Sequence, residues 1–151
     1  MTATARGAAP DRVALDVVVT GTASDAHTWN LVYLQLVLEE LGHRVTNLGA
    51  TVPVALLVDH CRAHRPDLVV VSSVNGHGAM DGRELIAALR AVSELRDTPV
   101  VIGGKLGIGG PEDRHHPGDL LRAGFDAVFV DGVQPTVFQS YLKSLSAGER
   151  R

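Results

Sequence analysis

Val13-Ala-Leu-Asp-Val-Val-Val-Thr20 is followed directly by Gly21-Thr-Ala-Ser-Asp-Ala-His-Thr-Trp-Asn30. The first stretch is a short β-branched run, which is typical of a buried strand. From Trp29 to Leu41 leucines recur at helical spacing, and Gly42 marks the stop of a helix. A strand, a loop and a helix in this order predict the first unit of an α/β sheet, with the loop at the carboxyl end of a strand.

The same alternation continues along the chain. Further strands are predicted at residues 43–48, 67–72, 99–102 and 126–130, and further helices at 51–64, 80–95, 118–123 and 134–145. Thr51 is the expected N-cap of its helix, with Pro53 in the first turn. Five strands and five helices in this order predict a flavodoxin-like, doubly wound, Rossmann-like parallel sheet of strand order 2-1-3-4-5. We expect one domain over residues 13–145, a disordered lead-in at 1–12 and a frayed tail at 146–151.

Composition narrows the function classes. The chain has 151 residues, of which 45% are hydrophobic and 4% aromatic, and its formal net charge is −3. No basic run points to nucleic acid, and no apolar run approaches the roughly 20 residues of a membrane span. The N-terminus lacks the apolar segment of a signal peptide. The single cysteine, Cys61, excludes an internal disulfide and favours a cytoplasmic protein; it is expected to be a small buried residue.

Three unusual loops follow the first, third and fourth predicted strands, whose carboxyl ends are neighbours in this fold. They are Ser24-Asp-Ala-His27, Ser72-Ser-Val-Asn-Gly-His-Gly78 and Gly103-Gly-Lys-Leu-Gly-Ile-Gly-Gly110. An aspartate two residues from a histidine can orient the imidazole of a metal ligand. The many glycines allow close approach of backbone to a ligand. Neither a P-loop nor a Rossmann fingerprint is present, so the loops indicate a large ligand that lies across all three.

Simpler interpretations of these residues remain open. The alternatives are an exposed loop histidine for His27, a cap of the following helix for Asp25, and an ordinary strand end for Ser72 and Ser73. His60 and His64 are spaced i, i+4, but no cysteine or carboxylate completes a zinc site, so they indicate a solvated face. His77 faces either a ligand or a partner, and His115 and His116 are assigned no role beyond a polar loop.

Together the three loops resemble the cobalamin-binding domain of the base-off, histidine-on class. In particular, they resemble the small, cobalamin-binding subunit of glutamate mutase (methylaspartate mutase), over about residues 13–145. The resemblance implies that His27 is the lower axial ligand of cobalt and that Asp25 accepts a hydrogen bond from its other ring nitrogen. It also implies that the nucleotide tail of the cofactor lies between the sheet and the first helix.

The remaining site residues follow from the same resemblance. Ser24, Ala26 and Thr28 flank the axial histidine, and Ser72, Ser73 and Val74 line the tail slot. The other cofactor-binding positions are Gly76, Gly103, Gly104, Lys105, Leu106, Gly107, Ile108 and Gly109.

The implied function is the cobalamin-binding component of an adenosylcobalamin-dependent carbon-skeleton mutase that acts on glutamate or a related amino acid. The resemblance places the substrate site on a larger TIM-barrel subunit, so the chain is expected to be inactive alone. Alternatives are the small subunit of an acyl-CoA mutase and a non-catalytic cobalamin module, either a methyl carrier or a regulator. The implied partners are this cofactor and that subunit, without nucleic acid or a membrane.

The chain departs from the family pattern at one place. The pattern is usually Asp-x-His-x-x-Gly, and here Asn30 takes the glycine position after Trp29. Asparagine tolerates unusual backbone angles, so the turn is expected to persist. Trp29 has three candidate roles: contact with the corrin rim, part of a partner interface, or packing at the start of the helix.

Overall fold

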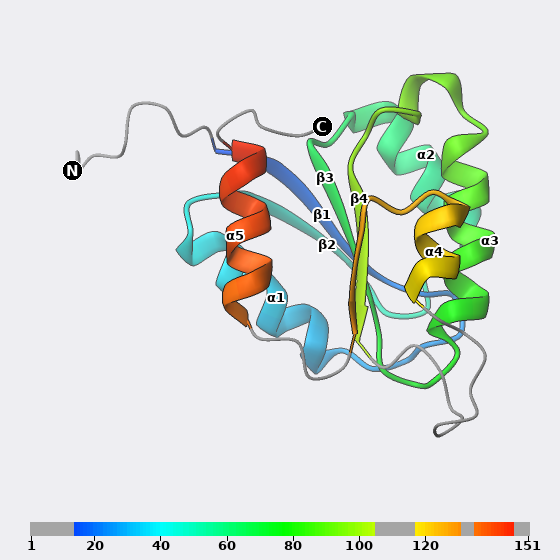
Figure 1. Ribbon diagram of the computed structural model, residues 1–151, viewed down its shortest axis with the longest axis horizontal. Helices are drawn as coiled ribbons and strands as arrows, with labels where there is room; N and C mark the ends of the chain where they lie inside the picture. Colours follow the sequence, from blue (N-terminus) through cyan, green and yellow to red (C-terminus); the bar gives the residue numbers. More distant parts are fainter. Residues whose placement is uncertain (1–13, 105–116, 131–134, 147–151) are drawn as a thin grey trace.

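The computed structural model describes residues 14–104, 117–130 and 135–146 (Figure 1). In chain order the elements are β1 (Asp16–Gly21), α1 (Trp29–Glu40), β2 (Arg44–Gly49), α2 (Val54–His64), β3 (Leu68–Ser73), α3 (Gly78–Arg90), the 3-10 helix η2 (Ser93–Leu95), β4 (Val100–Gly104), α4 (Pro117–Ala123), β5 (Ala127–Val130) and α5 (Pro135–Ser146).

The five strands form one parallel sheet of order β2-β1-β3-β4-β5, which confirms the predicted fold class. β3 is central, and all six of its residues are buried. At its carboxyl end, Ser72 pairs with Gly21 of β1 and with Gly103 of β4. The ends of these three strands are therefore adjacent, and the loops that leave β1 and β3 begin side by side.

Helices cover both faces of the sheet. α1 and α5 lie on one face, and α2, α3 and α4 lie on the other (Figure 1). Alternation along β1 divides its valines between two cores: Val17 and Val19 pack with Leu31 and Leu38 of α1, whereas Val18 packs against the opposite helix layer. Because both faces are buried, the central strands are continuous apolar runs.

Two predicted details are wrong. Thr51 is not the N-cap of α2: it has a positive φ of 49°, its hydroxyl donates to the carbonyl of Ala50, and Pro53 is the N-cap. The predicted helix over 80–95 is interrupted, since α3 ends at Arg90 and a separate 3-10 turn follows. By contrast Gly42 does follow the end of α1, with a φ of +97° that favours glycine.

Arg90 stabilises the edge of the sheet opposite the three loops. Its guanidinium donates to the carbonyls of Gly124, Leu95, Arg96 and Thr98. It also pairs with the Asp126 carboxylate at 2.9 Å. One planar fork thus bonds carbonyl groups at the end of η2, after α4 and on the approach to β4.

Cys61 is fully buried in α2, as predicted, and burial raises the pKa of its thiol to about 11. Within the described ranges, none of the helices has the length and apolar character of a membrane span. The predicted lead-in at 1–12 lies outside these ranges. The predicted tail at 146–151 does too, except for Ser146, which ends α5.

Candidate functional site

Asp25 and His27 form a directly bonded pair in the loop after β1. Asp25 Oδ1 lies 2.7 Å from Nδ1 of His27 and accepts a second hydrogen bond from the His27 backbone N–H at 3.0 Å. The aspartate side chain is 1% exposed and the histidine side chain is 60% exposed. The N-cap of α1 is Thr28, without a side-chain bond, so Asp25 does not cap this helix.

The second carboxylate oxygen of Asp25 binds the loop after β3. Asp25 Oδ2 accepts from the backbone N–H groups of Val74 at 2.7 Å and Asn75 at 3.2 Å. Burial by itself raises the pKa of the carboxyl, but hydrogen bonds from the His27 and Val74 backbones and from the His27 ring outweigh it and hold the pKa below 3.8. Asp25 is therefore a buried carboxylate that joins two loops.

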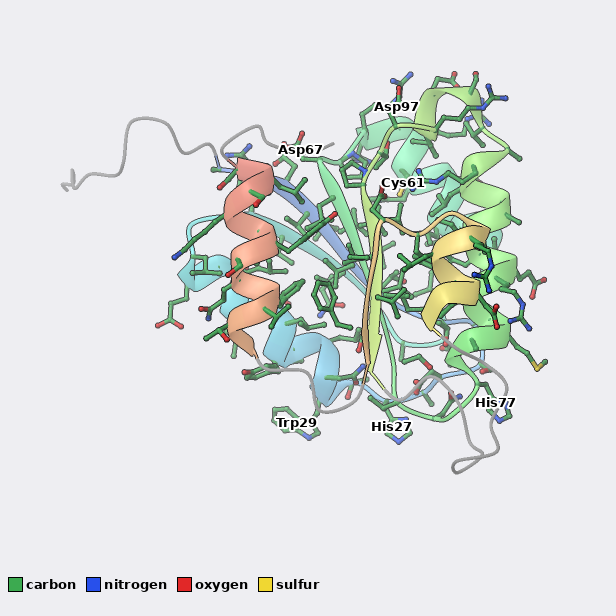
Figure 2. The ribbon with its side chains drawn as sticks, viewed as in Figure 1. His27, Trp29, Cys61, Asp67, His77 and Asp97 are labelled. Carbon is green, nitrogen blue, oxygen red and sulfur yellow. The ribbon has the colours of Figure 1, made fainter. Side chains whose placement is uncertain are left out.

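This pairing fixes the chemistry that His27 offers. A carboxylate can only accept, so Nδ1 of His27 is the donor in this bond, and in the neutral imidazole the lone pair then lies on Nε2. Figure 2 shows His27 at the carboxyl edge of the sheet, directed away from it, at the same end as Trp29 and His77. An exposed imidazole nitrogen supported by a buried carboxylate is the arrangement that a metal-binding histidine requires.

A polar network that the sequence analysis did not single out links the same loops. Asn75 donates to the carbonyl and hydroxyl oxygens of Ser24, both at 3.1 Å, and its side-chain oxygen accepts from the N–H of His77 at 2.9 Å. The Ser24 hydroxyl donates to Asp81 of α3 at 2.5 Å. Asn75 thus joins the loops after β1 and β3, and Asp81 ties the first of these loops to α3.

Ser72 contacts the first turn of α1. The amide nitrogen of Asn30 donates to Oγ of Ser72 at 2.7 Å, whereas Oδ1 of Asn30 is buried without a partner in the described part of the chain. Asn30 is helical, so its tolerance of unusual backbone angles has no part in the turn. Ser73 is fully buried and donates to the side-chain oxygen of Asn75 at 3.3 Å.

The glycines that end β4 are explained by neighbouring strands. Gly104 has a φ of +108°, and a Cβ there would lie 2.1 Å from the carbonyl oxygen of Ser73. A Cβ on Gly103 would lie 3.0 Å from the carbonyl oxygen of Phe129. In the other loop Gly76 has a φ of +90°. Close approach of strands requires glycine at 104 and leaves little room for a Cβ at 103, which the ligand-centred interpretation did not anticipate.

The structure places the remaining candidates as follows. Ala26 and Thr28 are exposed beside His27, and Val74 is half-buried. Trp29 is 81% exposed, so it does not pack at the start of α1. Lys105, Leu106, Gly107, Ile108 and Gly109, together with His115 and His116, lie outside the described residues.

His60 and His64 behave as a surface pair. Their rings stack with centroids 4.1 Å apart, and Nδ1 of His64 lies 3.0 Å from the carbonyl oxygen of His60. Among the side chains that the structure describes, no group of three metal-binding residues is present. The prediction of a solvated face rather than a zinc site is consistent with this geometry.

Comparison with known proteins defines the class. The model of the B12 binding domain matches residues 15–137, and the chain belongs to this family. A cobalamin-binding protein from Desulfitobacterium hafniense has the same fold, with a TM-score of 0.64 and 27% identity over 85% of this chain and 59% of that one.

More specific relatives share much of the chain. The glutamate mutase sigma subunit of Halobacterium salinarum is 35% identical over 113 residues, which are 74% of each chain. The transcriptional repressor CarA of Myxococcus xanthus is 37% identical over 83 residues, but these are 54% of this chain and only 28% of the repressor. The predicted resemblance to glutamate mutase small subunits is thereby confirmed.

Proposed function

We propose that this chain is the cobalamin-binding small subunit of an adenosylcobalamin-dependent carbon-skeleton mutase of the glutamate mutase (methylaspartate mutase) type. It holds cobalamin base-off, with Nε2 of His27 as the lower axial ligand of cobalt. The observation that carries the proposal is a histidine whose side chain is 60% exposed and whose Nδ1 is bonded to the buried Asp25 carboxylate at 2.7 Å. Similarity to a sigma subunit along 74% of the chain supports the mutase class.

The residues at the carboxyl edge of the sheet have distinct roles in this proposal. Asp25 fixes the tautomer of His27 and increases the electron donation of its imidazole. Ser24, Ala26 and Thr28 shape the loop around the histidine. The nucleotide tail would lie between the sheet and α1, in a slot lined by Ser72, Ser73 and Val74. The further cofactor-binding positions of the proposal are Gly76, Gly103, Gly104, Lys105, Leu106, Gly107, Ile108 and Gly109.

Bound adenosylcobalamin supplies a cobalt–carbon bond whose cleavage starts radical chemistry, while the protein positions the cofactor and tunes its metal. The substrate, glutamate or a related amino acid, is bound by a larger TIM-barrel subunit. The small subunit is inactive alone in this scheme and works in the cytoplasm.

Two other assignments use the same cofactor site. The small subunit of an acyl-CoA mutase would differ only in the partner that recognises the substrate. A non-catalytic module is favoured by one observation, the 37% identity to a repressor over 83 residues. Co-purification with a large barrel subunit, and isomerase activity of the mixture, would separate a mutase from a methyl carrier or regulator.

The ligand test uses nitrogen isotopes. Protein labelled with ¹⁵N is loaded with hydroxocobalamin, reduced to cobalt(II) and examined by EPR. Axial His27 gives the two-line nitrogen coupling of ¹⁵N, whereas the cofactor's own ¹⁴N base gives three lines. His27→Ala abolishes the two-line pattern, and His77→Ala, which alters an exposed histidine at the same edge, retains it. A three-line spectrum from the labelled, unaltered protein would rule out histidine ligation.

A further inference from the structure

The side-chain amide of Asn30 has one bonded end and one unpaired end. Its amide nitrogen donates to Ser72 at 2.7 Å, and this bond joins the first turn of α1 to the carboxyl end of β3. Its carbonyl oxygen, Oδ1, is buried and has no partner in the described ranges. Native proteins rarely leave a buried polar atom unpaired, so such an atom calls for an explanation.

The position of the unpaired atoms is informative. The other buried side-chain atom without a partner in the described ranges is the hydroxyl of Thr22. Both residues lie in the segment between the end of β1 and the first turn of α1, on either side of His27. In the part of the chain that the structure describes, the unpaired buried side-chain atoms thus belong to the segment that carries the proposed axial ligand, which points to a polar group that arrives with a ligand.

The bond from Asn30 also leaves the hydroxyl hydrogen of Ser72 free to donate. Because Oγ of Ser72 accepts from the Asn30 amide, its own hydrogen stays available for donation. A half-turn of the amide would exchange its nitrogen and oxygen, and one buried polar end would remain open in either orientation. Asn30 and Ser72 together therefore present a hydroxyl and an amide at the junction of helix and sheet.

We infer that Asn30 is a binding residue for the nucleotide tail of the corrinoid, an inference that rests on the proposed function. Its open carbonyl accepts a hydrogen bond from a ribose hydroxyl of the tail, while its nitrogen orients the Ser72 hydroxyl toward the same tail. The dimethylbenzimidazole base has no N–H or O–H of its own when it is part of the nucleotide, so the ribose is the donor. Asparagine here adds a polar contact that the glycine of the family pattern lacks.

The experiment compares two corrinoids that differ in the tail. Dissociation constants of hydroxocobalamin and of diaquocobinamide, which lacks the nucleotide, are measured by absorbance for the unaltered chain and for Asn30→Ala. The preference for cobalamin over cobinamide should fall about tenfold in N30A, as expected for the loss of one buried hydrogen bond. Affinity for cobinamide should stay the same, and Asn30→Gly should reproduce the loss.

Asn47 provides the matched control. Both ends of its amide are bonded within the protein, to Gln35 at 3.1 Å and to the N–H of Gly49 at 2.9 Å. Asn47→Ala should lower the melting temperature of the free protein without changing the corrinoid preference. N30A should lower the corrinoid preference; because it removes the bond to Ser72 as well as an unpaired carbonyl, the preference and not the melting temperature is its readout.

The outcomes separate this inference from the proposed function. An unchanged or increased preference for cobalamin in N30A would overturn the role of Asn30 and leave the cofactor assignment standing. Failure of the unaltered chain to bind either corrinoid would overturn the proposed function and this inference with it.

Discussion

His27 Nδ1 and Asp25 Oδ1 lie 2.7 Å apart, yet one side chain is 60% exposed and the other 1%. The exposed member therefore owes its orientation to the buried one, which in turn is held by backbone N–H groups of two loops. The position of the imidazole is set before any ligand arrives. Such preorganisation lowers the conformational entropy lost on binding.

Replacement of Asp25 by asparagine should weaken cobalamin binding about 10- to 100-fold, the usual effect of losing the partner of a metal-binding histidine. The amide cannot accept from all the N–H groups that the carboxylate satisfies, so we also expect a loss of about 1–3 kcal/mol in the free energy of unfolding. Absorbance titration and urea unfolding measure the two effects.

Asp67 supplies the control for this change. It lies at the opposite edge of the sheet (Figure 2) and accepts from the backbone N–H of Asp16 at 2.8 Å. Asp67→Asn should leave cobalamin affinity unaltered. Equal losses of affinity in both variants would mean that Asp25 acts through general stability.

The contribution of Asp25 to the free energy of unfolding should vary with pH in the acid range. Its pKa in the folded chain is below the ordinary 3.8, so the folded state binds fewer protons than the unfolded state in this range. The stability contributed by the carboxylate is present above pH 3.8 and is lost as pH falls through the lower, folded pKa. The difference in unfolding free energy between the unaltered chain and Asp25→Asn should shrink below pH 3.8. A difference that stays constant would contradict the depressed pKa.

Gly104→Ala should lower the free energy of unfolding by more than the conformational cost of a positive φ alone. Gly42 has a similar φ, +97° against +108°, but a Cβ there meets nothing within 4 Å. Gly42→Ala therefore measures the conformational cost, about 1–2 kcal/mol. In G104A the added carbon would lie 2.1 Å from the carbonyl oxygen of Ser73, so the loss should be clearly larger. Urea unfolding of both variants tests this, and equal losses would show that β4 can shift freely.

Arg90→Lys should lower the free energy of unfolding by about 1–3 kcal/mol. A lysine retains the charge but cannot donate in a fork to the carbonyls of Gly124, Leu95 and Thr98. The carbonyl of Leu95 would still accept from the N–H of Thr98, whereas the other two would lose this donor. Arg122→Lys alters an arginine that is 75% exposed and paired with Asp119, and it should change stability by less than about 0.5 kcal/mol. Thermal unfolding compares the two, and similar effects would contradict a structural role for Arg90.

Trp29 should report cofactor binding by fluorescence. It is the single tryptophan and is 81% exposed, two residues from His27. Emission of the free protein should have the long-wavelength maximum of a water-exposed indole. Bound cobalamin, which absorbs strongly in the near ultraviolet and visible, should quench it. His27→Ala should reduce the quenching at a given cobalamin concentration, whereas emission that cobalamin leaves unchanged would place the corrin away from Trp29.

The sequence was sufficient for the sheet order, because apolar runs separated by helical periodicity leave few alternatives. It was insufficient where backbone conformation is set by tertiary contacts. Thr51 has the residue type of an N-cap, but a positive φ and a bond to its neighbour's carbonyl place it before the helix. Periodicity also continued through Ala91 and Val92, where α3 has already ended.

The part of the site that depends on residues close in sequence was predicted, and the part that depends on tertiary contacts was not. Asp25 and His27 are close in sequence, so spacing alone suggests their bond. Asn75 and Asp81 contact Ser24 from 51 and 57 residues away, and no local pattern marks such pairs. The glycines 103 and 104 stood out, but their reason, contact with the backbone of β3 and β5, became visible only with the strands in register.

Asp25 binds the loop after β3 through main-chain N–H groups and not through side chains. Every amino acid except proline supplies such a group. Residues 74 and 75 are therefore free to diverge among related chains, as far as this carboxylate is concerned, provided that neither becomes proline. The support of His27 therefore requires the Asp25 carboxylate and two main-chain N–H groups, and this carboxylate makes no demand on the side chains at 74 and 75.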